Sequence, residues 1–317
     1  MTEKESIPLP PPERWGVLLL AHGAPDKLED IPQFLLNVRG GRPLPDPVVK
    51  EITRRYSLIG GGSPLLRLTI LQAEALAKLI AHPVYVGMRN WKPFIAEAVR
   101  RLNDDGVNRV VAVCLAPQNS RTSTGLYRKN LMDAAQQMRT GLAVDFIESY
   151  HDHPGLIEAY CERAEAALLA VRQETGGPVP VIFTAHSVPE RTIGDGDPYE
   201  KQARETARLV AQAMGLTEFR TAFQSQGMTA EKWIGPTVES QIDELAQAGV
   251  KDVLLVPVGF VSDHVEILYD IDVLFHDYGK ARGVKVRRSV SLNDSAKFAA
   301  ALASLVTGRI GTIDGKI

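Results

Sequence analysis

The chain has 317 residues, of which 44% are hydrophobic and 23% charged, as in an ordinary soluble globular protein of one large or two medium domains. The formal net charge of −2 provides no general attraction to nucleic acid or to an anionic membrane surface. The two cysteines form no C-x-x-C pair, no apolar run approaches about 18 residues, and the N-terminus lacks a signal pattern. We therefore predict a cytoplasmic protein with no membrane span, zinc ribbon or sequence-local iron–sulfur motif.

The first half of the chain is predicted to alternate strands and helices after a flexible, proline-rich lead-in over residues 1–12. The predicted strands of this half are 16–21, 84–86, 110–115 and 143–147. Its predicted helices are 31–39, 48–56, 65–80, 92–103 and 126–138.

The second half continues the alternation. Its predicted helices are 155–173, 199–214, 236–248, 265–276 and 295–306. Its predicted strands are 179–185, 219–224, 253–256 and 284–289. Strands that alternate with helices of 10 to 20 residues are typical of parallel sheets with crossover connections.

The two halves also resemble each other. Strand 110–116 and the Gly-Val pair before it match strand 253–259 and its own Gly-Val pair, at a constant spacing of 143 residues. Two other strands run into an Ala-His pair, at His22 and at His186. Chance similarity between generic strand–helix units is the alternative to an internal duplication. We predict an α/β fold of two similar Rossmann-like lobes, each a parallel sheet flanked by helices, with a cleft between them.

The predicted N-terminal lobe covers residues 13–150 and the C-terminal lobe covers residues 151–292. The last helix, within 293–307, is expected to pack back on the N-terminal lobe. Residues 308–317 are expected to form a flexible tail.

Four ionisable residues follow the buried strand 253–256 closely: Asp263, His264, Glu266 and Asp270. In a helix Glu266 and Asp270 share a face, because they are four residues apart. Ligands of open α/β sheets bind beyond the carboxyl ends of the strands, so this segment is a candidate metal or proton-transfer site. The alternative is that these acids only complement the dipole at a helix N-terminus.

His186 lies in a polar turn at the end of another strand, where a catalytic imidazole is well placed, although a plain turn residue is the alternative. Together with Glu266 it offers one nitrogen and one oxygen, a pair that suits a first-row divalent ion held weakly enough to be released. Neither half has ligands at structural-zinc spacing, so a closed metal site is not expected.

A basic segment could bind an acidic substrate through paired contacts to carboxylates, or could be a solvated basic helix end. It contains Arg39, Arg42, Arg54 and Arg55, and a glycine run with Ser63 follows it. Neither G-x-G-x-x-G nor a P-loop pattern occurs, so dinucleotide and nucleotide binding lose their main support.

Longer motifs resemble those of the ferrochelatase family over roughly residues 15–305. They are YSLIGGGSPL (56–65), LAPQNS (115–120), TAHSVPER (184–191), GDPYEKQ (196–202), FQSQGMTAEKWIGPTV (223–238) and PVGFVSDHVEILYD (257–270). The resemblance implies two chelatase-type lobes with a porphyrin cleft between them. It also implies insertion of Fe(II) into a porphyrin with loss of two pyrrole protons.

The same resemblance implies roles for individual residues. His186 is expected to be the proton acceptor or metal-facing ligand, and Glu266 the opposing carboxylate. Asp263 and His264 are expected to orient the histidine and line the pocket. Asp270 is the next acid of a metal or proton relay, and with His186 and Glu266 it makes up the expected metal-contacting set.

Two positions depart from the family pattern. Leu274 stands where the relay usually has a further acid, and Asp272 or Asp277 are the candidates to replace it. His22 stands where relatives commonly have tyrosine or methionine. We expect His22 on the porphyrin face opposite His186, in a position to ligate the product iron.

The resemblance is greatest to the monomeric type that uses coproporphyrin III, which bears four propionates. Segment 57–64 is small and polar and the tail after Val306 has no cysteine, whereas membrane-associated relatives have an apolar lip and often a cysteine-rich extension. The positions that match propionate contacts of the coproporphyrin type are Arg39, Arg55, Ser63 and Tyr127.

We therefore expect a lyase of haem biosynthesis that converts coproporphyrin III to coprohaem. No cofactor or iron–sulfur cluster is expected, because Fe²⁺ is itself a substrate. A monomer that passes its product to a downstream haem-pathway enzyme is expected. The alternatives are a protoporphyrin IX ferrochelatase, a cobaltochelatase acting on sirohydrochlorin, and a non-catalytic tetrapyrrole carrier; the FQS, WIGP and SDHVE segments disfavour the cobalt enzyme.

Overall fold

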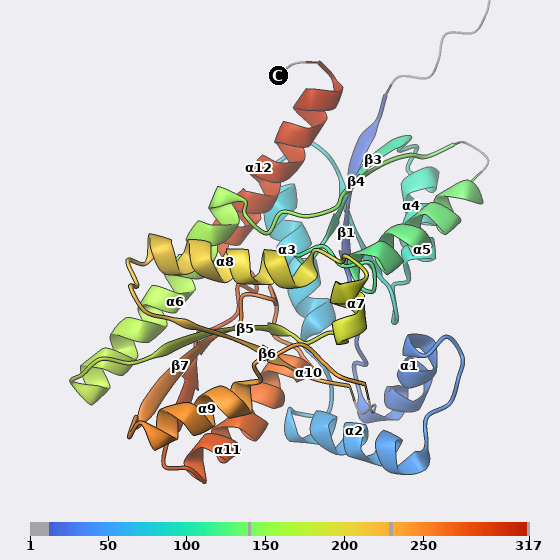
Figure 1. The fold of residues 1–317 in the computed structure, drawn as a ribbon. Coiled ribbons are helices and arrows are strands. Elements are labelled where there is room, and N and C mark those ends of the chain that lie inside the picture. The colour runs from blue at the N-terminus through green and yellow to red at the C-terminus, as the bar shows by residue number, and fades with distance from the viewer. Residues whose placement is uncertain (1–12, 139–140, 228–230, 316–317) are drawn as a thin grey trace, which may run out of the picture.

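The computed structural model describes residues 13–138, 141–227 and 231–315, so the predicted lead-in and residues 316–317 of the predicted tail lie outside the described residues. Within these ranges the strands form two four-stranded parallel sheets, in the orders β2-β1-β3-β4 and β6-β5-β7-β8 (Figure 1). The strands are β1 (Trp15–Ala21), β2 (Val84–Met88), β3 (Arg109–Cys114), β4 (Ala143–Ile147), β5 (Val181–His186), β6 (Arg220–Gln224), β7 (Asp252–Val256) and β8 (Lys285–Arg288).

Helices flank both sheets. In the N-terminal half they are α1 (Ile31–Val38), α2 (Asp46–Leu58), α3 (Leu65–Ala77), α4 (Ile95–Asp104) and α5 (Thr124–Gln136), with a 3₁₀ turn η1 (Leu28–Asp30) before α1. In the C-terminal half they are α6 (Pro154–Thr175), α7 (Glu190–Gly194), α8 (Tyr199–Ala213), α9 (Val238–Gln247), α10 (Val265–Leu268), α11 (His276–Lys280) and α12 (Ala296–Ile313), with a π-helical segment η2 (Asp270–Phe275).

The predicted two-lobed α/β fold is confirmed. Adding four to each strand number of the first sheet reproduces the order of the second sheet, which agrees with an internal duplication. The central strands are runs of aliphatic side chains because helices cover both faces of a parallel sheet; every residue of β1 is buried. β1 and β5 occupy equivalent places in the two sheets, so His22 and His186 emerge at equivalent strand ends.

One apolar core joins the two lobes. It contains Val17 of β1, Phe183 of β5, Leu254 of β7 and Phe298 of α12, all at most 1% exposed. Parallel strands from both sheets therefore bury side chains of one face into the same volume, while the other face of each sheet packs into a cluster of its own.

The last helix, α12, packs against α3 and α6, and Figure 1 shows it running beside α3. Arg309 donates a hydrogen bond to Asp145 of β4 at 2.8 Å, so the end of α12 lies on the N-terminal lobe. The predicted flexible tail is wrong over residues 308–313, which are helical. Apolar spacing continues through the buried Val306 and Ile310, and this outweighs the two glycines that favour an end to the helix.

The predicted single helix 265–276 is divided into α10, η2 and α11. The carbonyl of Tyr269 accepts hydrogen bonds from the amides of both Val273 and Leu274, so one turn closes over five residues instead of four. Such a π turn inserts one extra residue and occurs often at functional sites.

No helix that the structure describes combines the length and the apolar character needed to cross a membrane.

Candidate active site

His186 and Glu266 come together from two different strand–helix units of the C-terminal lobe. His186 is the last residue of β5, and Glu266 lies in α10, which follows β7. The Nε2 atom of His186 is 3.4 Å from Oε1 of Glu266, and the two side chains are 34% and 33% exposed. The imidazole and carboxylate expected to act together are therefore adjacent and partly open to solvent.

The pKa of His186 is raised and the pKa of Glu266 is lowered, so His186 carries the proton of the pair. Burial alone would lower the pKa of His186, but the charge and hydrogen bond of Glu266 outweigh burial and raise it to about 9. Burial alone would raise the pKa of Glu266, but His186 and His264 hold it well below its ordinary value. At neutral pH the free protein therefore carries an imidazolium–carboxylate pair at this site.

This ion pair is expected to make stability depend on pH in a defined window. The contribution of Glu266 is present above its ordinary pKa of 4.5 and is lost as pH falls, whereas that of His186 is complete below 6.5 and is lost as pH rises through about 9. The difference in Tm between the wild type and Glu266→Gln should therefore be greatest between about pH 5 and 6.5 and shrink toward pH 9 and above. Thermal unfolding measured across this range checks the prediction; a difference that is independent of pH contradicts it.

His264 contacts the other oxygen of the same carboxylate. Its Nε2 is 3.4 Å from Oε2 of Glu266, and its ring lies against Phe260 with ring centroids 5.1 Å apart. Glu266 is therefore held between two imidazoles, one on each oxygen.

Asp263 contacts groups other than a histidine, and the orienting role that we expected from the resemblance stays a prediction. Its carboxylate accepts hydrogen bonds from Ser291 at 2.8 Å and from Asn293 at 3.0 Å, and Arg288 lies 3.2 Å away. These contacts tie the turn before α10 to the segment after β8. Asp263 thus supports the backbone that carries His264 and does not contact a histidine through these bonds.

Asp270 is the first residue of η2, and its carboxylate accepts a short hydrogen bond from Ser225. Burial raises the pKa of Asp270 to about 6, against the opposing effect of that bond. An acid with this pKa can both take and release a proton near neutral pH.

Asp272 and Asp277, the candidates to replace the missing relay acid, form contacts with basic side chains outside the His186–Glu266 pair. Both oxygens of Asp272 accept from Arg288, at 2.6 and 2.9 Å, and Asp277 contacts its neighbour His276 at 3.2 Å. Leu274 is 38% exposed. The expectation that either aspartate continues the relay is not supported by these contacts.

Among residues 13–138, 141–227 and 231–315, no group of three or more His, Cys, Asp or Glu side chains is arranged to hold a metal ion. His186 and Glu266 can present one nitrogen and one oxygen to an ion, and the ion-binding role of Asp270 stays a prediction.

His22 lies at the matching strand end of the N-terminal lobe. Its Nδ1 is 2.9 Å from the Gly23 carbonyl and its Nε2 is 3.0 Å from the Asn90 side-chain amide. Nδ1 therefore carries the proton and Nε2 accepts from Asn90. His22 is exposed as a residue. Desolvation of its ring by the neighbouring side chains lowers its pKa against the opposing effects of the Gly23 carbonyl and the Glu266 charge, which favours a neutral ring at pH 7. Ligation of product iron stays a prediction, and it requires Asn90 to release Nε2.

The basic residues of α2 contact the C-terminal lobe. Arg54 donates to the hydroxyl of Tyr269 at 2.7 Å, and Arg55 lies over the same ring at 5.0 Å from its centroid. Glu51 accepts from both arginines, which lowers its pKa to about 2. One carboxylate thus balances two guanidinium groups, and α2 is left with one net positive charge beside α10.

The three other residues expected to contact propionates differ in their exposure and in their contacts. Arg39 is exposed at the end of α1, and the amide of Ser63 donates to the Pro25 carbonyl at 2.9 Å. Gly62 makes this contact possible, because a Cβ there would lie 2.0 Å from the carbonyl oxygen of Asp26. Tyr127 is only 4% exposed, so its role in binding a propionate stays a prediction.

Sequence reasoning missed Arg89 and Asn90. Arg89 lies over the ring of Tyr127 at 5.6 Å, and the amides of Arg89 and Asn90 bond to the carbonyls of Ala21 and His22. The available signal was their position directly after β2, the strand that pairs with β1 and so brings its end beside His22.

Two surface grooves contain neither His186 nor Glu266. A groove of about 810 Å³ lies among α5, β4 and α12, and includes Arg128, Phe146 and Arg309. A smaller hollow of about 410 Å³ includes Ser63, Arg67 and Ile70. The first is separate from the predicted site; the second shares only Ser63 with it.

The sequence is similar to those of known proteins along nearly its whole length. The family model described as Ferrochelatase matches residues 14–310. A ferrochelatase of Acidobacterium capsulatum is 48% identical over 309 residues, which cover 92% of this chain and 94% of that protein. A coproporphyrin III ferrochelatase of Geobacillus sp. strain WCH70 is 35% identical, with 94% of this chain and 98% of that protein covered.

Among solved structures, SirB from Bacillus subtilis with Fe³⁺ has a TM-score of 0.60 and 12% identity, and the match covers 96% of this chain and 98% of that chain. At this identity the likeness concerns the fold alone. The match of the family model over nearly the whole chain, together with these relatives, leads to one conclusion: the chain belongs to the ferrochelatase family.

Proposed function

We propose that this protein inserts Fe(II) into coproporphyrin III to give coprohaem in haem biosynthesis. The observation that supports metal insertion most directly is the His186–Glu266 pair, 3.4 Å apart and partly exposed. The choice of coproporphyrin III is supported by the arginines of α2 and by the similarity to the Geobacillus coproporphyrin III ferrochelatase.

Metal insertion needs a base and a way to expose the pyrrole nitrogens. A planar porphyrin hides its NH protons, so binding energy of roughly 1–5 kcal/mol must distort the ring. In the free protein His186 is protonated because Glu266 faces it. An incoming cation repels that proton, so binding of Fe²⁺ and deprotonation of His186 are coupled. The neutral imidazole can then accept a pyrrole proton.

Asp270 is suited to carry protons away from the pair. Its charge affects His186, and its pKa of about 6 lies close to neutrality. Ser225, which donates to this carboxylate, keeps it oriented. Asp270 can therefore accept a proton that leaves His186 and release it again near neutral pH.

The propionates of the substrate are proposed to meet Arg55, with Arg54 and Arg89 as further cations. Arg55 is 32% exposed on its side chain and shares Glu51 with Arg54, so its guanidinium is oriented before the substrate arrives. Paired contacts between arginine and carboxylate are directional as well as strong. A substrate with four carboxylates can use more of these donors than one with two.

The proposal also covers cofactors, location and assembly. No cofactor is needed, because Fe²⁺ is consumed as a substrate. We propose that the protein acts in the cytoplasm as a monomer and that a downstream enzyme of the haem pathway receives its product.

Anaerobic turnover with Fe(II) on coproporphyrin III and on protoporphyrin IX tests the proposal. We expect kcat/KM to be at least about tenfold higher with coproporphyrin III, and Arg55→Met to lower it about 10- to 100-fold with that substrate, as for loss of a charged hydrogen bond. Arg208→Met, which removes an exposed arginine paired with Glu205, is the matched control. Equal or faster turnover of protoporphyrin IX would identify that porphyrin as the substrate, and porphyrin binding without metal insertion would identify a carrier.

A further inference from the structure

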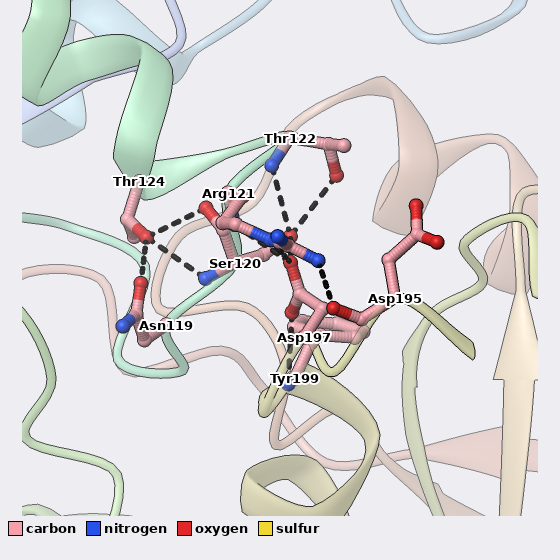
Figure 2. A network of polar contacts seen from close by, with 8 residues as sticks. All are labelled: Asn119, Ser120, Arg121, Thr122, Thr124, Asp195, Asp197 and Tyr199. Carbon is pink, nitrogen blue, oxygen red and sulfur yellow. Dashed lines mark hydrogen bonds and ion pairs between the residues drawn. The ribbon is translucent and has the colours of Figure 1, made fainter. Parts of the chain in front are cut away.

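Two of the family-like motifs, LAPQNS and GDPYEKQ, contain none of the catalytic residues discussed above, yet the fold brings them together across the two lobes. The first lies between β3 and α5 of the N-terminal lobe, and the second covers the end of the loop after α7 and the first turn of α8 in the C-terminal lobe. Figure 2 shows Ser120 of the first motif beside Asp197 of the second.

Asp197 is a fully buried carboxylate, with 0% of its side chain exposed. Its Oδ2 accepts from the hydroxyl of Ser120 at 3.2 Å and from the amide of Arg121 at 2.7 Å. Its Oδ1 accepts from the amide of Tyr199 at 3.0 Å. Donors from both lobes therefore meet on one carboxylate, and we call this set of Ser120, Arg121, Asp197 and Tyr199 the Asp197 bridge (Figure 2).

Further cross-lobe bonds surround the bridge. Arg121 also donates to the carbonyl of Asp195 at 2.6 Å, and the amide of Asn119 donates to the Gln202 side chain at 2.6 Å. A buried charge is costly unless hydrogen bonds satisfy it, so the loop positions that provide these donors are closely constrained.

Tyr199 connects the bridge to His186. It is the first residue of α8, is 7% exposed, and its hydroxyl donates to the backbone carbonyl of His186 at 2.9 Å. Burial raises the pKa of Tyr199, so the hydroxyl remains a donor.

The peptide group that joins His186 to Ser187 is thereby held at both ends. Its oxygen accepts from Tyr199, and its N–H donates to the carbonyl of Gln224 at 2.7 Å. The ring of His186 is in turn bonded through Nδ1 to the Ser187 carbonyl, which leaves Nε2 facing Glu266. A rotation of this peptide would move the imidazole away from the carboxylate.

We propose that Asp197 and Tyr199 are positioning residues for metal insertion: the Asp197 bridge fixes the His186–Ser187 peptide, and through it the imidazole, relative to the N-terminal lobe. The proposal rests on the proposed ferrochelatase function. Neither residue touches the reacting atoms. Their effect is on geometry, and a displacement of about 1 Å at a reacting group can slow a reaction about a hundredfold.

Tyr199→Phe removes only the hydroxyl. We expect kcat for metal insertion to fall at least about tenfold, with KM for porphyrin and for Fe(II) unchanged within about twofold. Asp197→Asn should act in the same direction. Ser120→Ala removes one donor from the opposite lobe and should lower kcat by about threefold, and it serves as the second variant if a change at Asp197 prevents folding. Tyr85→Phe, at a tyrosine bonded to Asp105 away from the site, is the matched control and should leave kcat unchanged.

Amide hydrogen exchange of the free protein provides a readout that does not depend on catalysis. The segment 181–190 should exchange at least about tenfold faster in Tyr199→Phe than in the wild type, whereas β3 should not change. If Tyr199→Phe lowers kcat without changing exchange, or changes exchange without lowering kcat, the positioning role is wrong. A rise in KM with loss of porphyrin binding also overturns it, because the tyrosine then acts in substrate binding.

Failure of the proposed function has a different signature. A wild-type protein that inserts no metal under any condition overturns the ferrochelatase proposal. The exchange comparison alone then decides whether the Asp197 bridge holds the His186–Ser187 peptide.

Discussion

Replacement of Glu266 by glutamine is expected to lower kcat for metal insertion about a thousandfold at pH 7, within the range for loss of a proton-transfer group. Glutamine keeps the size of the side chain but removes the charge that faces both His186 and His264. The pKa of His186 should then fall from about 9, because the charge and hydrogen bond of Glu266 are gone while the Ser187 carbonyl and Asp270 still raise it. More of the imidazole is then neutral at pH 7, so low activity in this variant does not come from a shortage of free base. The loss of activity reports the absence of the carboxylate.

Stopped-flow metal insertion and NMR titration of labelled histidine check the two parts of this prediction. Glu205→Gln is the matched control, because Glu205 forms an exposed ion pair with Arg208. Its kcat should equal that of the wild type. If Glu266→Gln retains more than about a tenth of the wild-type kcat, Glu266 does not take part in the chemical step.

His186→Ala is expected to reduce kcat about 10³- to 10⁴-fold while porphyrin binding changes little. The substitution removes the only imidazole that contacts Oε1 of Glu266 among the described residues, and the remaining contact is from His264 to Oε2. With one cation gone, the pKa of Glu266 should rise from its lowered value, and the variant should bind Fe(II) less tightly. The lower kcat and the weaker binding of Fe(II) both follow from the loss of the Nε2 atom of His186.

Added imidazole gives this experiment a second arm. Alanine leaves space at a side chain that is partly exposed, so free imidazole should restore part of the activity in His186→Ala but not in Glu266→Gln. His276→Ala is the control, since His276 is exposed and contacts only its neighbour Asp277 among the contacts described above. Substantial activity in His186→Ala without imidazole would mean that another base accepts the pyrrole protons.

The strands, the two lobes and the central pair of the site could be predicted from the sequence. Aliphatic runs such as 16–21 and 253–256 identify buried parallel strands, because two covered faces require apolar side chains at every position. The duplication then places His22 and His186 at equivalent strand ends. Glu266 could be found because the acidic segment follows a strand, in the region where α/β folds bind ligands.

The direction of each side chain could not be predicted. Asp263 and Glu266 are three residues apart, yet Asp263 bonds to Ser291 and Asn293 whereas Glu266 faces the histidines. The π turn at Tyr269 has no signal in the local apolar pattern, and the bond from Arg54 to the Tyr269 hydroxyl comes from a helix far away in sequence. The role of Asn90 beside His22 depends on the register between β1 and β2.

The shared core has a consequence for the synthesis of the protein. Helix α12, which supplies Phe298, Leu302 and Val306 to that core, follows both sheets in the chain. The strands of both sheets are therefore synthesised first and lack these partners until α12 has been made. Contacts so distant in sequence slow folding and leave apolar surface uncovered in the meantime. Nascent chains stalled before residue 296 should therefore be targets for chaperones, and emergence of α12 from the ribosome should be the event that closes the core.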